Sequence, residues 1–178
     1  GKVSTSLANS GLDVDANSTV TSLTVGHTTP VSIASGITLS GAITVTAGSI
    51  KLGEAGTLGS TVSMSGGTLD ADETLTLSGA LSHTDDITID VADTKTLTYS
   101  GAAVSLGAKT LTLKGGGTLG NANALVLNDA SSKLLLNSIT VGKVSTSLAN
   151  SGLDVDANSS VTSLTVGHTT PVSIASGI

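Results

Sequence analysis

The residues best suited to bind a metal ion form an Asp-x-Asp-x-Asn motif at Asp13, Asp15 and Asn17. Calcium takes oxygen ligands from carboxylate and carbonyl groups, and this spacing matches the opening of an EF-hand loop. The glycine and the glutamate that such a loop needs later in its sequence are replaced by Ser18 and Thr24. The motif recurs once, as Asp154, Asp156 and Asn158. We therefore name Asp13, Asp15 and Asn17 as a calcium candidate, but we expect no metal site and no cofactor.

Groups that would serve in catalysis are few and scattered. The histidines are His27, His83 and His168, and the Val-Gly-His-Thr-Thr-Pro setting of His27 predicts a surface turn. The acidic group that comes closest to a catalytic set is Asp85, Asp86, Asp90 and Asp93. The chain has no arginine to hold an acidic sugar and no Gly-x-Ser-x-Gly elbow. We expect that the chain is not an enzyme. A carbohydrate-active β-helix enzyme is an alternative, which a groove with paired carboxylates and a lysine would favour.

Thr-x-Thr pairs indicate a different surface chemistry, because flat arrays of such pairs characterise ice-binding solenoids. The pairs are Thr19/Thr21, Thr44/Thr46, Thr74/Thr76, Thr96/Thr98 and Thr110/Thr112. An ice-binding face needs the pairs at a constant step, whereas the first threonines of these pairs are unevenly spaced along the sequence. Threonine is also common on the polar outer face of ordinary strands. Ice binding is therefore an alternative function and not the leading one.

The composition excludes several classes of function. The net charge is −6, and the basic residues are seven lysines, so no basic surface is available to neutralise nucleic-acid phosphates. The absence of cysteine excludes disulfides and thiolate metal sites. No run of about 18 apolar residues occurs, so we expect no membrane-spanning part in this segment. The chain is rich in serine and threonine and has a mean hydropathy of +0.36, which predict an ordered fold that buries small and branched side chains in rows.

The chain contains a tandem repeat. Residues 1–37 recur at residues 142–178 with one difference, Thr19 against Ser160. Because every other position is identical, we interpret residues 1–141 as one full period and residues 142–178 as the start of the next. Both ends of the sequence fall inside this pattern. We therefore expect one continuous solenoid that is a segment of a longer repeat array.

A finer rhythm runs through the period. Fifteen apolar-x-apolar triplets occur in residues 1–141, and their middle residue is serine or threonine in eleven. Alternation with period two predicts strands, and the Gly, Asn, Asp and Ser residues between them predict turns. The strands are very short, the turns are small, and the large aromatic side chains that usually fill a β-sandwich are reduced to one tyrosine. These features predict an all-β fold, a parallel β-solenoid (β-helix). A period then has about five to seven coils of about 20–28 residues, each advancing about 4.8 Å.

Two adjoining stretches carry a resemblance to known proteins: SGGTLDADETLTLSGALSHTDDITIDVADTKTLTYSG and AAVSLGAKTLTLKGGGTLGNANALVLN. Their TLTLSG-type strands and Gly-Ser-Asn turns resemble bacterial surface proteins built of β-strand repeats, such as autotransporter passenger domains and filamentous adhesins. The resemblance implies an exported, elongated, non-enzymatic β-helix. We therefore expect a structural or adhesive filament at the cell surface, in the extracellular space. Its expected partners are copies of itself and glycans of a host cell or matrix, with no nucleic acid.

Two triplets have an apolar residue where the others have a polar one. In Leu125-Val126-Leu127 and Leu134-Leu135-Leu136, the alternation predicts that Val126 and Leu135 point away from the core. Apolar side chains on a surface otherwise rich in hydroxyl groups indicate burial against a partner. We predict that Val126 and Leu135 mark a lateral contact between neighbouring fibres or chains. Cover by a loop of the same chain, or a strand that turns over, is the alternative.

Overall fold

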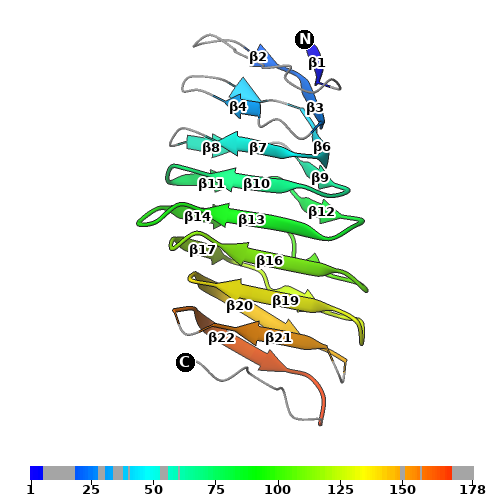
Figure 1. Cartoon of the computed structure of the whole chain (residues 1–178), viewed down its shortest axis with the longest axis vertical. Coiled ribbons are helices and arrows are strands. Elements are labelled where there is room, and N and C mark those ends of the chain that lie inside the picture. The colour runs from blue at the N-terminus through cyan, green and yellow to red at the C-terminus, as the bar shows by residue number, and fades with distance from the viewer. Residues whose placement is uncertain are drawn as a thin grey trace.

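The structure is a computed structural model. It describes residues 1–5, 19–27, 31–33, 38–39, 41–52, 56–59, 61–148, 151–156 and 158–169. All secondary structure in these ranges is β-strand, and the strands stack as turns of an elongated solenoid whose axis is vertical in Figure 1. Neighbouring strands run parallel, as they must when a chain climbs in one direction. The predicted fold, an all-β parallel β-solenoid, is confirmed.

Successive turns contribute strands to three faces. Face 1 is made of β1 (Lys2–Thr5), β3 (Ser22–Gly26), β6 (Ile43–Ala47), β9 (Val62–Met64), β12 (Leu81–His83), β15 (Val104–Ser105) and β18 (Leu125–Leu127). Face 2 is made of β4 (Val31–Ile33), β7 (Ser49–Leu52), β10 (Thr68–Ala71), β13 (Ile87–Val91), β16 (Thr110–Lys114), β19 (Lys133–Asn137) and β21 (Gly152–Val155). Face 3 is made of β8 (Gly56–Leu58), β11 (Leu75–Leu77), β14 (Thr96–Tyr99) and β17 (Thr118–Asn121).

Four further strands complete the faces. The strands β2 (Thr19–Val20) and β5 (Thr38–Leu39) form a two-stranded sheet. In the order of the chain, they come where the strands of face 3 come in later turns. The strands β20 (Thr140–Thr146) and β22 (Ser160–Val166) are longer. The first half of β20 pairs with β17 on face 3, and its second half pairs with β18 on face 1. Near the C-terminal end, faces 3 and 1 therefore join into one eight-stranded sheet.

The turns stay in register at the strands and differ in length at the corners. On face 2, Leu69 is paired with Ile89 and Ile89 with Leu113, so the second of these turns is longer than the first. On face 1, Ile43 is paired with Val62, and this turn contains fewer residues than either of the two turns on face 2. The extra residues lie in the corner loops, because a residue added within a strand would turn every inward side chain outward.

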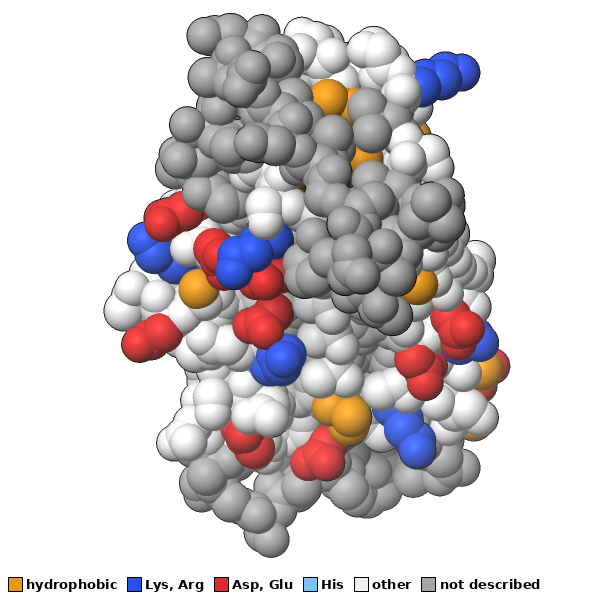
Figure 2. Space-filling model, turned by 45° about the horizontal axis from the view of Figure 1, so that its top comes forward, with side chains coloured by type: hydrophobic (Ala, Val, Ile, Leu, Met, Phe, Trp, Pro, Cys, Tyr) orange, Lys and Arg blue, Asp and Glu red, His pale blue; other side chains and the backbone are white. Residues whose placement is uncertain are grey.

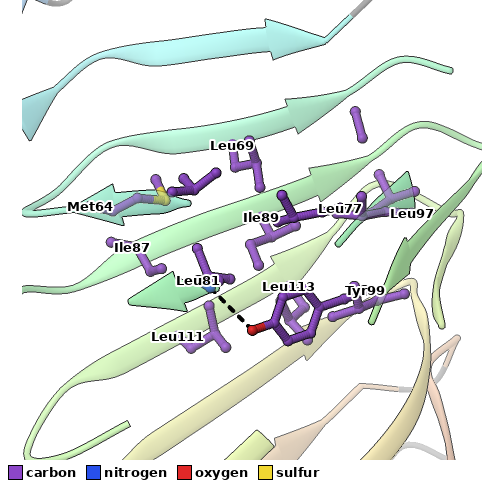
Figure 3. Packing of buried hydrophobic residues seen from close by; sticks show 14 of the residues in the cluster. Met64, Leu69, Leu77, Leu81, Ile87, Ile89, Leu97, Tyr99, Leu111 and Leu113 are labelled. Atoms are coloured by element: carbon purple, nitrogen blue, oxygen red, sulfur yellow. Dashed lines mark hydrogen bonds between the residues drawn. The ribbon is translucent and has the colours of Figure 1, made fainter. Parts of the chain in front are cut away.

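The interior is a continuous row of mostly aliphatic side chains. Thirteen of the predicted triplets have both apolar residues described, and in all thirteen both residues are buried. Figure 3 shows how residues such as Leu69, Ile89 and Leu113 from successive turns lie above one another inside the solenoid. At the second inward position, several strands have a residue other than a large aliphatic one, among them Ala71, His83, Tyr99 and Asn121.

The hydrogen-bond ladder of face 1 is interrupted between β12 and β15, which are adjacent but not paired. Elsewhere on this face, a strand's N–H donates to a carbonyl of the following turn (Leu23 to Ala42, Ile43 to Thr61, Val62 to Ala80 and Val104 to Ala124). At the break, the N–H of Leu81 donates instead to the hydroxyl of Tyr99 over 3.1 Å, as Figure 3 shows. The same hydroxyl donates to the carbonyl of Ala102 over 2.7 Å. The chain's one aromatic residue thus replaces a missing backbone partner.

The corner between faces 1 and 2 depends on glycine. Gly48 and Gly67 occupy this corner in consecutive turns and have φ values of +72° and +79°, in the left-handed region. A Cβ atom on Gly67 would collide with the carbonyl oxygen of Gly48 in the turn before it. The same carbonyl accepts a 2.8 Å hydrogen bond from the N–H of Thr68. Close approach of the two turns therefore requires glycine here for two independent reasons.

The two copies of the repeat occupy equivalent places in the solenoid. Val3 is paired with Leu23 and Val144 with Leu164, and the flanking pairs keep the same register in both copies. On face 1, seven steps from strand to strand lead from Val3 to its repeat copy Val144. One full period of the sequence repeat therefore corresponds to seven whole turns.

Candidate functional site

Asp13, Asp15 and Asn17, the calcium candidate, lie outside the described residues. In the repeat copy of this motif, Asp154 is exposed on face 2 and Asp156 lies at the corner after β21. The Oδ1 atom of Asp156 accepts hydrogen bonds from the N–H of Ser138 (3.0 Å), the hydroxyl of Ser159 (2.7 Å) and the N–H of Asn158 (3.3 Å).

These donors give Asp156 a structural role. The N–H of Ser138, followed by the hydroxyl of Ser159, lowers the pKa of the Asp156 carboxyl because both donors favour its ionised form. Ser138 belongs to the preceding turn, so the carboxylate ties two turns together. No group of three or more His, Asp or Glu side chains is placed to hold a metal ion in the part of the chain that the structure describes.

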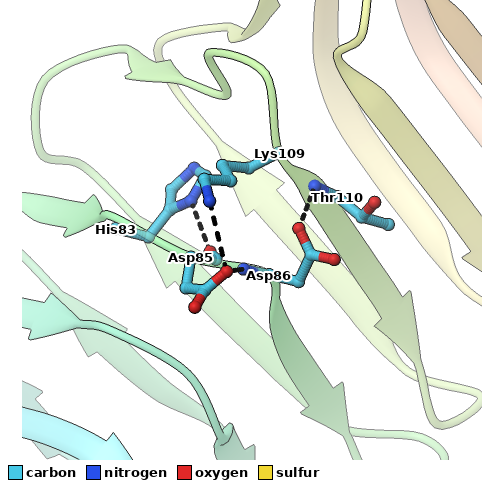
Figure 4. Close-up of polar contacts among 5 residues, drawn as sticks. All are labelled: His83, Asp85, Asp86, Lys109 and Thr110. Atoms are coloured by element: carbon cyan, nitrogen blue, oxygen red, sulfur yellow. Dashed lines mark hydrogen bonds and ion pairs between the residues drawn. The ribbon is translucent and has the colours of Figure 1, made fainter.

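A second carboxylate corner joins β12–β13 to the following turn. As Figure 4 shows, Oδ1 of Asp85 accepts hydrogen bonds from the N–H of Asp86 (3.0 Å) and from Nζ of Lys109 (3.3 Å). A carboxyl oxygen of Asp86 accepts the N–H of Thr110 over 2.8 Å at the start of β16. The Asp86 N–H, followed by Lys109, lowers the pKa of Asp85. Both carboxylates therefore bind donors of the protein itself and fasten adjacent turns.

His83 lies at the same corner, with Nδ1 3.1 Å from the carbonyl oxygen of Asp85. Because a carbonyl only accepts, this contact requires the proton on Nδ1. The Nε2 atom has no hydrogen-bond partner and is buried. The corner thus brings a histidine and two carboxylates together with a lysine of the following turn, but the carboxylates bind backbone N–H groups and the lysine. This arrangement stabilises the stack.

Charged side chains form a row along face 2. The register places Lys51, Asp70, Asp90 and Lys114 at equivalent outward positions in four consecutive turns. Lys51 forms an ion pair with Asp72 (2.6 Å) and Lys114 with Asp90 (3.2 Å). In Figure 2, acidic and basic side chains accordingly lie next to each other on the surface in view. Asp72, through a hydrogen bond and its charge, raises the pKa of Lys51.

Within this row, burial and then the charge of Asp72 raise the pKa of Asp70. A raised pKa means that the folded chain binds the proton more tightly than the unfolded chain. Ionised Asp70 therefore destabilises the fold at pH values above its folded pKa, and this cost disappears below the unfolded pKa of about 3.9.

We expect Asp70→Asn to raise the free energy of unfolding at pH 7 by less than about 1 kcal/mol, the scale of partly exposed charge interactions. At about pH 3 the variant and the parent chain should have equal stability, because Asp70 is already protonated. Urea unfolding at the two pH values measures this. Asp85→Asn is the matched control and should act in the opposite direction at pH 7, because its pKa is lowered. Destabilisation by Asp70→Asn at pH 7 would contradict the prediction.

Hydroxyl side chains also align from turn to turn. On face 3, Thr96, Thr118, Thr140 and Ser160 form one outward row. The adjoining row pairs Thr76 with Thr98 and then continues at Gly120. The irregular sequence steps between Thr-x-Thr pairs are thus compatible with aligned rows, because the corner loops differ in length. On the described part of this face, threonine nevertheless stands in both rows only in two turns, at Thr74/Thr76 and at Thr96/Thr98.

Val126 and Leu135 both take outward positions and are half-buried. Val126 lies on face 1 between Ser105 and Ser145 of the adjacent turns. Leu135 lies on face 2 between Thr112 and Asp154. The two side chains therefore belong to different faces, each flanked by polar residues, and do not form one patch. Their lateral contact with another chain stays a prediction.

The last described strand, β22, has an unpaired outer edge among the described residues. Its residues Ser163–Val166 repeat the sequence of Ser22–Val25 in β3. In β3, Val25 is 0% exposed, whereas the corresponding Val166 in β22 is 44% exposed. Leu164 is likewise only partly buried. The difference arises because β6 covers β3, and no described strand covers β22 in the same way.

The two histidines of the repeat, His27 and His168, also differ in burial. His27 is 6% exposed, so the prediction of a surface turn was wrong about its burial, although the residue does lie in a bend after β3. Its copy His168, after β22, is more exposed. The sequence alone does not distinguish the two copies. Their surroundings differ because one copy lies inside the stack and the other lies at the edge of the described part.

Comparison of the chain with protein-family models, with curated proteins and with solved structures found no match. In the described ranges, no helix is long and apolar enough to cross a membrane.

Proposed function

We propose that the chain is part of a long extracellular β-solenoid fibre at a cell surface, in which the 141-residue unit repeats without interruption and serves a structural or adhesive role. One observation supports this proposal above all others. The period equals seven whole turns, and the two copies have the same strand register. A further unit therefore continues the faces, the lumen and the hydrogen-bond ladders of the unit before it.

The physical basis of such a fibre is nearest-neighbour stacking. Each turn is held by the backbone ladders and lumen contacts of the turns above and below it, so stability grows with the number of turns. Ion pairs and carboxylate corners add links between consecutive turns, such as Lys114 with Asp90. The chain is rich in hydroxyl side chains and has a net charge of −6, which keep a long fibre hydrated. Continued stacking also leaves no strand edge exposed between units.

Chains that carry one, two or three further 141-residue units test the proposal. Each unit should lengthen the particle by about 34 Å, which is seven turns at the spacing of parallel strands, while its cross-section stays constant. Small-angle X-ray scattering measures both dimensions, and electron microscopy shows the shape. Particles that thicken, or that behave as flexibly jointed beads, would rule out a continuous fibre.

Surface location and adhesion are the finer parts of the proposal, and the resemblance to bacterial surface proteins supports them. Antibodies raised against the chain should label intact source cells without permeabilisation. Retention of the chain on an array of host-cell and matrix glycans tests adhesion. A fibre that labels the surface but binds no glycan would have the structural role alone.

Ice binding is a second candidate, favoured by the aligned hydroxyl rows on face 3. An ice-binding face needs several rows side by side, but the second row stops at Gly120. A Cβ atom at Gly120 would meet nothing within 4 Å, so a larger residue fits there. Thermal hysteresis of the chain distinguishes the candidates, because a structural fibre has no effect on ice growth. Hysteresis that increases in a Gly120→Thr variant, which extends the second row, would favour ice binding.

A further inference from the structure

We propose that face 2 is a self-association surface, on which a second copy of the chain docks side by side and antiparallel. A two-fold axis relates the two copies and passes between the levels of β13 and β16. The inference adds a lateral partner to the proposed function. It does not depend on further repeat units, because the turns of one chain carry every contact that it uses.

Face 2 presents two straight rows of outward side chains. Its strands form one unbroken sheet from β4 to β21 and lie in front in Figure 1. The strand register aligns the threonine row, which consists of Ser49, Thr68, Thr88, Thr112, Leu135 and Asp154. It also aligns the charged row, which consists of Lys51, Asp70, Asp90, Lys114 and Asn137.

The charged row suits contact with a second copy. The whole chain has a net charge of −6, whereas this row has as many lysines as carboxylates, so repulsion between two copies is weakest here. The side chains of Lys51 and Lys114 are 42% and 46% exposed. Each lysine has three N–H donors and forms one ion pair within the chain, with Asp72 or Asp90. Both lysines can therefore bind a further acceptor.

The order of the charges selects the position of the second copy. A two-fold axis that lies in the interface, perpendicular to the solenoid axis, places each row opposite itself in the reverse direction. From Lys51 to Lys114 the signs read plus, minus, minus, plus, which is the same in both directions. An axis between β10 and β13 would therefore place Asp70 opposite Asp90 and Lys51 opposite Lys114, and like charges repel. An axis at the level of any one of these four residues would place that residue opposite its own copy.

An axis between β13 and β16 removes every like-charge contact among these four residues. Asp90 then lies opposite Lys114 of the second copy, and the symmetry repeats this contact. With the ion pair within each chain, two aspartates and two lysines form one alternating group. Asp70 lies opposite Asn137, whose amide can donate a hydrogen bond to the carboxylate.

The threonine row fits the same placement. Thr88 lies opposite Thr112 of the second copy, and Leu135 lies opposite Thr68, whose methyl group covers it. Leu135 is the half-buried apolar residue in this row, and the contact supplies the partner that the sequence predicts for it. Val126 is on face 1 and takes no part in this contact.

The contact is small. The six strands from β7 to β21 span about 29 Å at about 4.8 Å each, and a strand of four or five residues is about 15 Å wide. Each copy therefore buries about 400 Å², half of the roughly 800 Å² that each partner buries in a typical stable complex. We expect a weak dimer of single chains whose affinity falls as salt is added. In a fibre of repeats the contact recurs in every period, so the total affinity rises steeply.

Sedimentation equilibrium of the 178-residue chain tests the inference, at protein concentrations up to about 1 mM. A reversible dimer is expected. Lys114→Glu should lower the association constant at least about tenfold, because it places a carboxylate opposite Asp90 of the second copy. Lys95→Glu is the matched control. It changes the net charge equally and removes an ion pair with Glu73, but Lys95 lies at the corner before β14, so the dimer should persist.

Mixing two charge variants separates a specific contact from a folding defect. Lys114→Glu chains and Asp90→Lys chains should each associate weakly. In the mixture, every carboxylate at these positions faces a lysine of the other variant, so heterodimers should form with about the affinity of the parent chain. A variant that fails to fold would not recover its partner in this way.

Single cysteines test the antiparallel placement, because the chain has no cysteine of its own. A mixture of Leu135→Cys chains and Thr68→Cys chains should form a disulfide-linked heterodimer under mild oxidation. Two chains of the same variant hold their thiols three turns apart, about 14 Å, whereas a disulfide needs Cα atoms within about 7 Å. Mass spectrometry of the linked species distinguishes the two outcomes.

Three results would overturn the inference: no association that depends on concentration, equal weakening by Lys95→Glu and Lys114→Glu, or cross-linking of one cysteine variant with itself as fast as in the mixture. If added units lengthen the particle but single chains do not associate through face 2, the lateral contact fails and the fibre stands. If the dimer forms as described but added units do not lengthen the particle, the fibre fails and the contact stands.

Discussion

Tyr99→Phe is expected to lower the free energy of unfolding by about 1–3 kcal/mol, although it removes a single oxygen atom. Tyr99 is 2% exposed, and its hydroxyl both accepts the N–H of Leu81 and donates to the carbonyl of Ala102. Without the hydroxyl, both backbone groups lose their partner at the break in the face 1 ladder. A buried donor or acceptor without a partner costs more than a hydrogen bond between exposed groups contributes.

Further truncation of the same residue should cost more. Tyr99→Ala also removes the ring from the lumen, and loss of a large buried side chain typically costs about 3–5 kcal/mol. Thr98→Val is the control. Thr98 is the exposed neighbour of Tyr99 and its hydroxyl faces outward, so its removal should change the free energy of unfolding by no more than about 0.5 kcal/mol. Urea unfolding followed by far-UV circular dichroism suits all three variants, since Tyr99 is the chain's one aromatic probe. Parent-like stability of Tyr99→Phe would contradict the assigned role of the hydroxyl.

Gly67→Ala is expected to lower the free energy of unfolding by at least about 2 kcal/mol. An L-residue in the left-handed region costs about 1–2 kcal/mol, and φ at Gly67 is +79°. In addition, the new Cβ atom would collide with the backbone oxygen of Gly48, which cannot move aside as a flexible side chain can. The corner between faces 1 and 2 must therefore open, and the turns on either side of it separate.

Gly120→Ala is the matched control for this substitution. Gly120 lies within β17, has no left-handed φ, and a Cβ atom there would meet nothing within 4 Å. Alanine is more favourable than glycine in a strand interior by about 0.5–1 kcal/mol, so this variant should be as stable as the parent or slightly more stable. Thermal unfolding of both variants measures the difference. Equal effects at the two positions would mean that corner geometry does not limit stability.

Much of the fold could be predicted from the sequence because the inward residues alternate with outward residues that are mostly polar. The triplet Leu23-Thr-Val25 is an example: both apolar residues are buried and the threonine between them is not. Strands whose second inward residue is Ala71, His83 or Asn121 depart from the triplet pattern, because the side chain at that position is short or polar. Asn121 becomes acceptable inside because its amide bonds to the backbone of Lys143 in the next turn.

The candidate sites were harder to predict, because they depend on how many residues each corner uses. Val126 and Leu135 lie close together in the sequence, and only the corner between β18 and β19 decides that they belong to different faces. The contact of Tyr99 with Leu81 also spans a turn whose length the sequence does not reveal.

The equality of one repeat with seven whole turns has a consequence for how the gene can change. A crossover between the coding sequences of two repeats inserts or deletes one whole period of codons, which preserves the reading frame. Because those codons encode complete turns, every strand after the event still stacks on a strand of the same face. A unit that ended at a different corner would instead present another face downstream of every crossover. Descendants of one gene can therefore differ in reach while their faces, corners and edges remain the same, and no compensating substitution is needed.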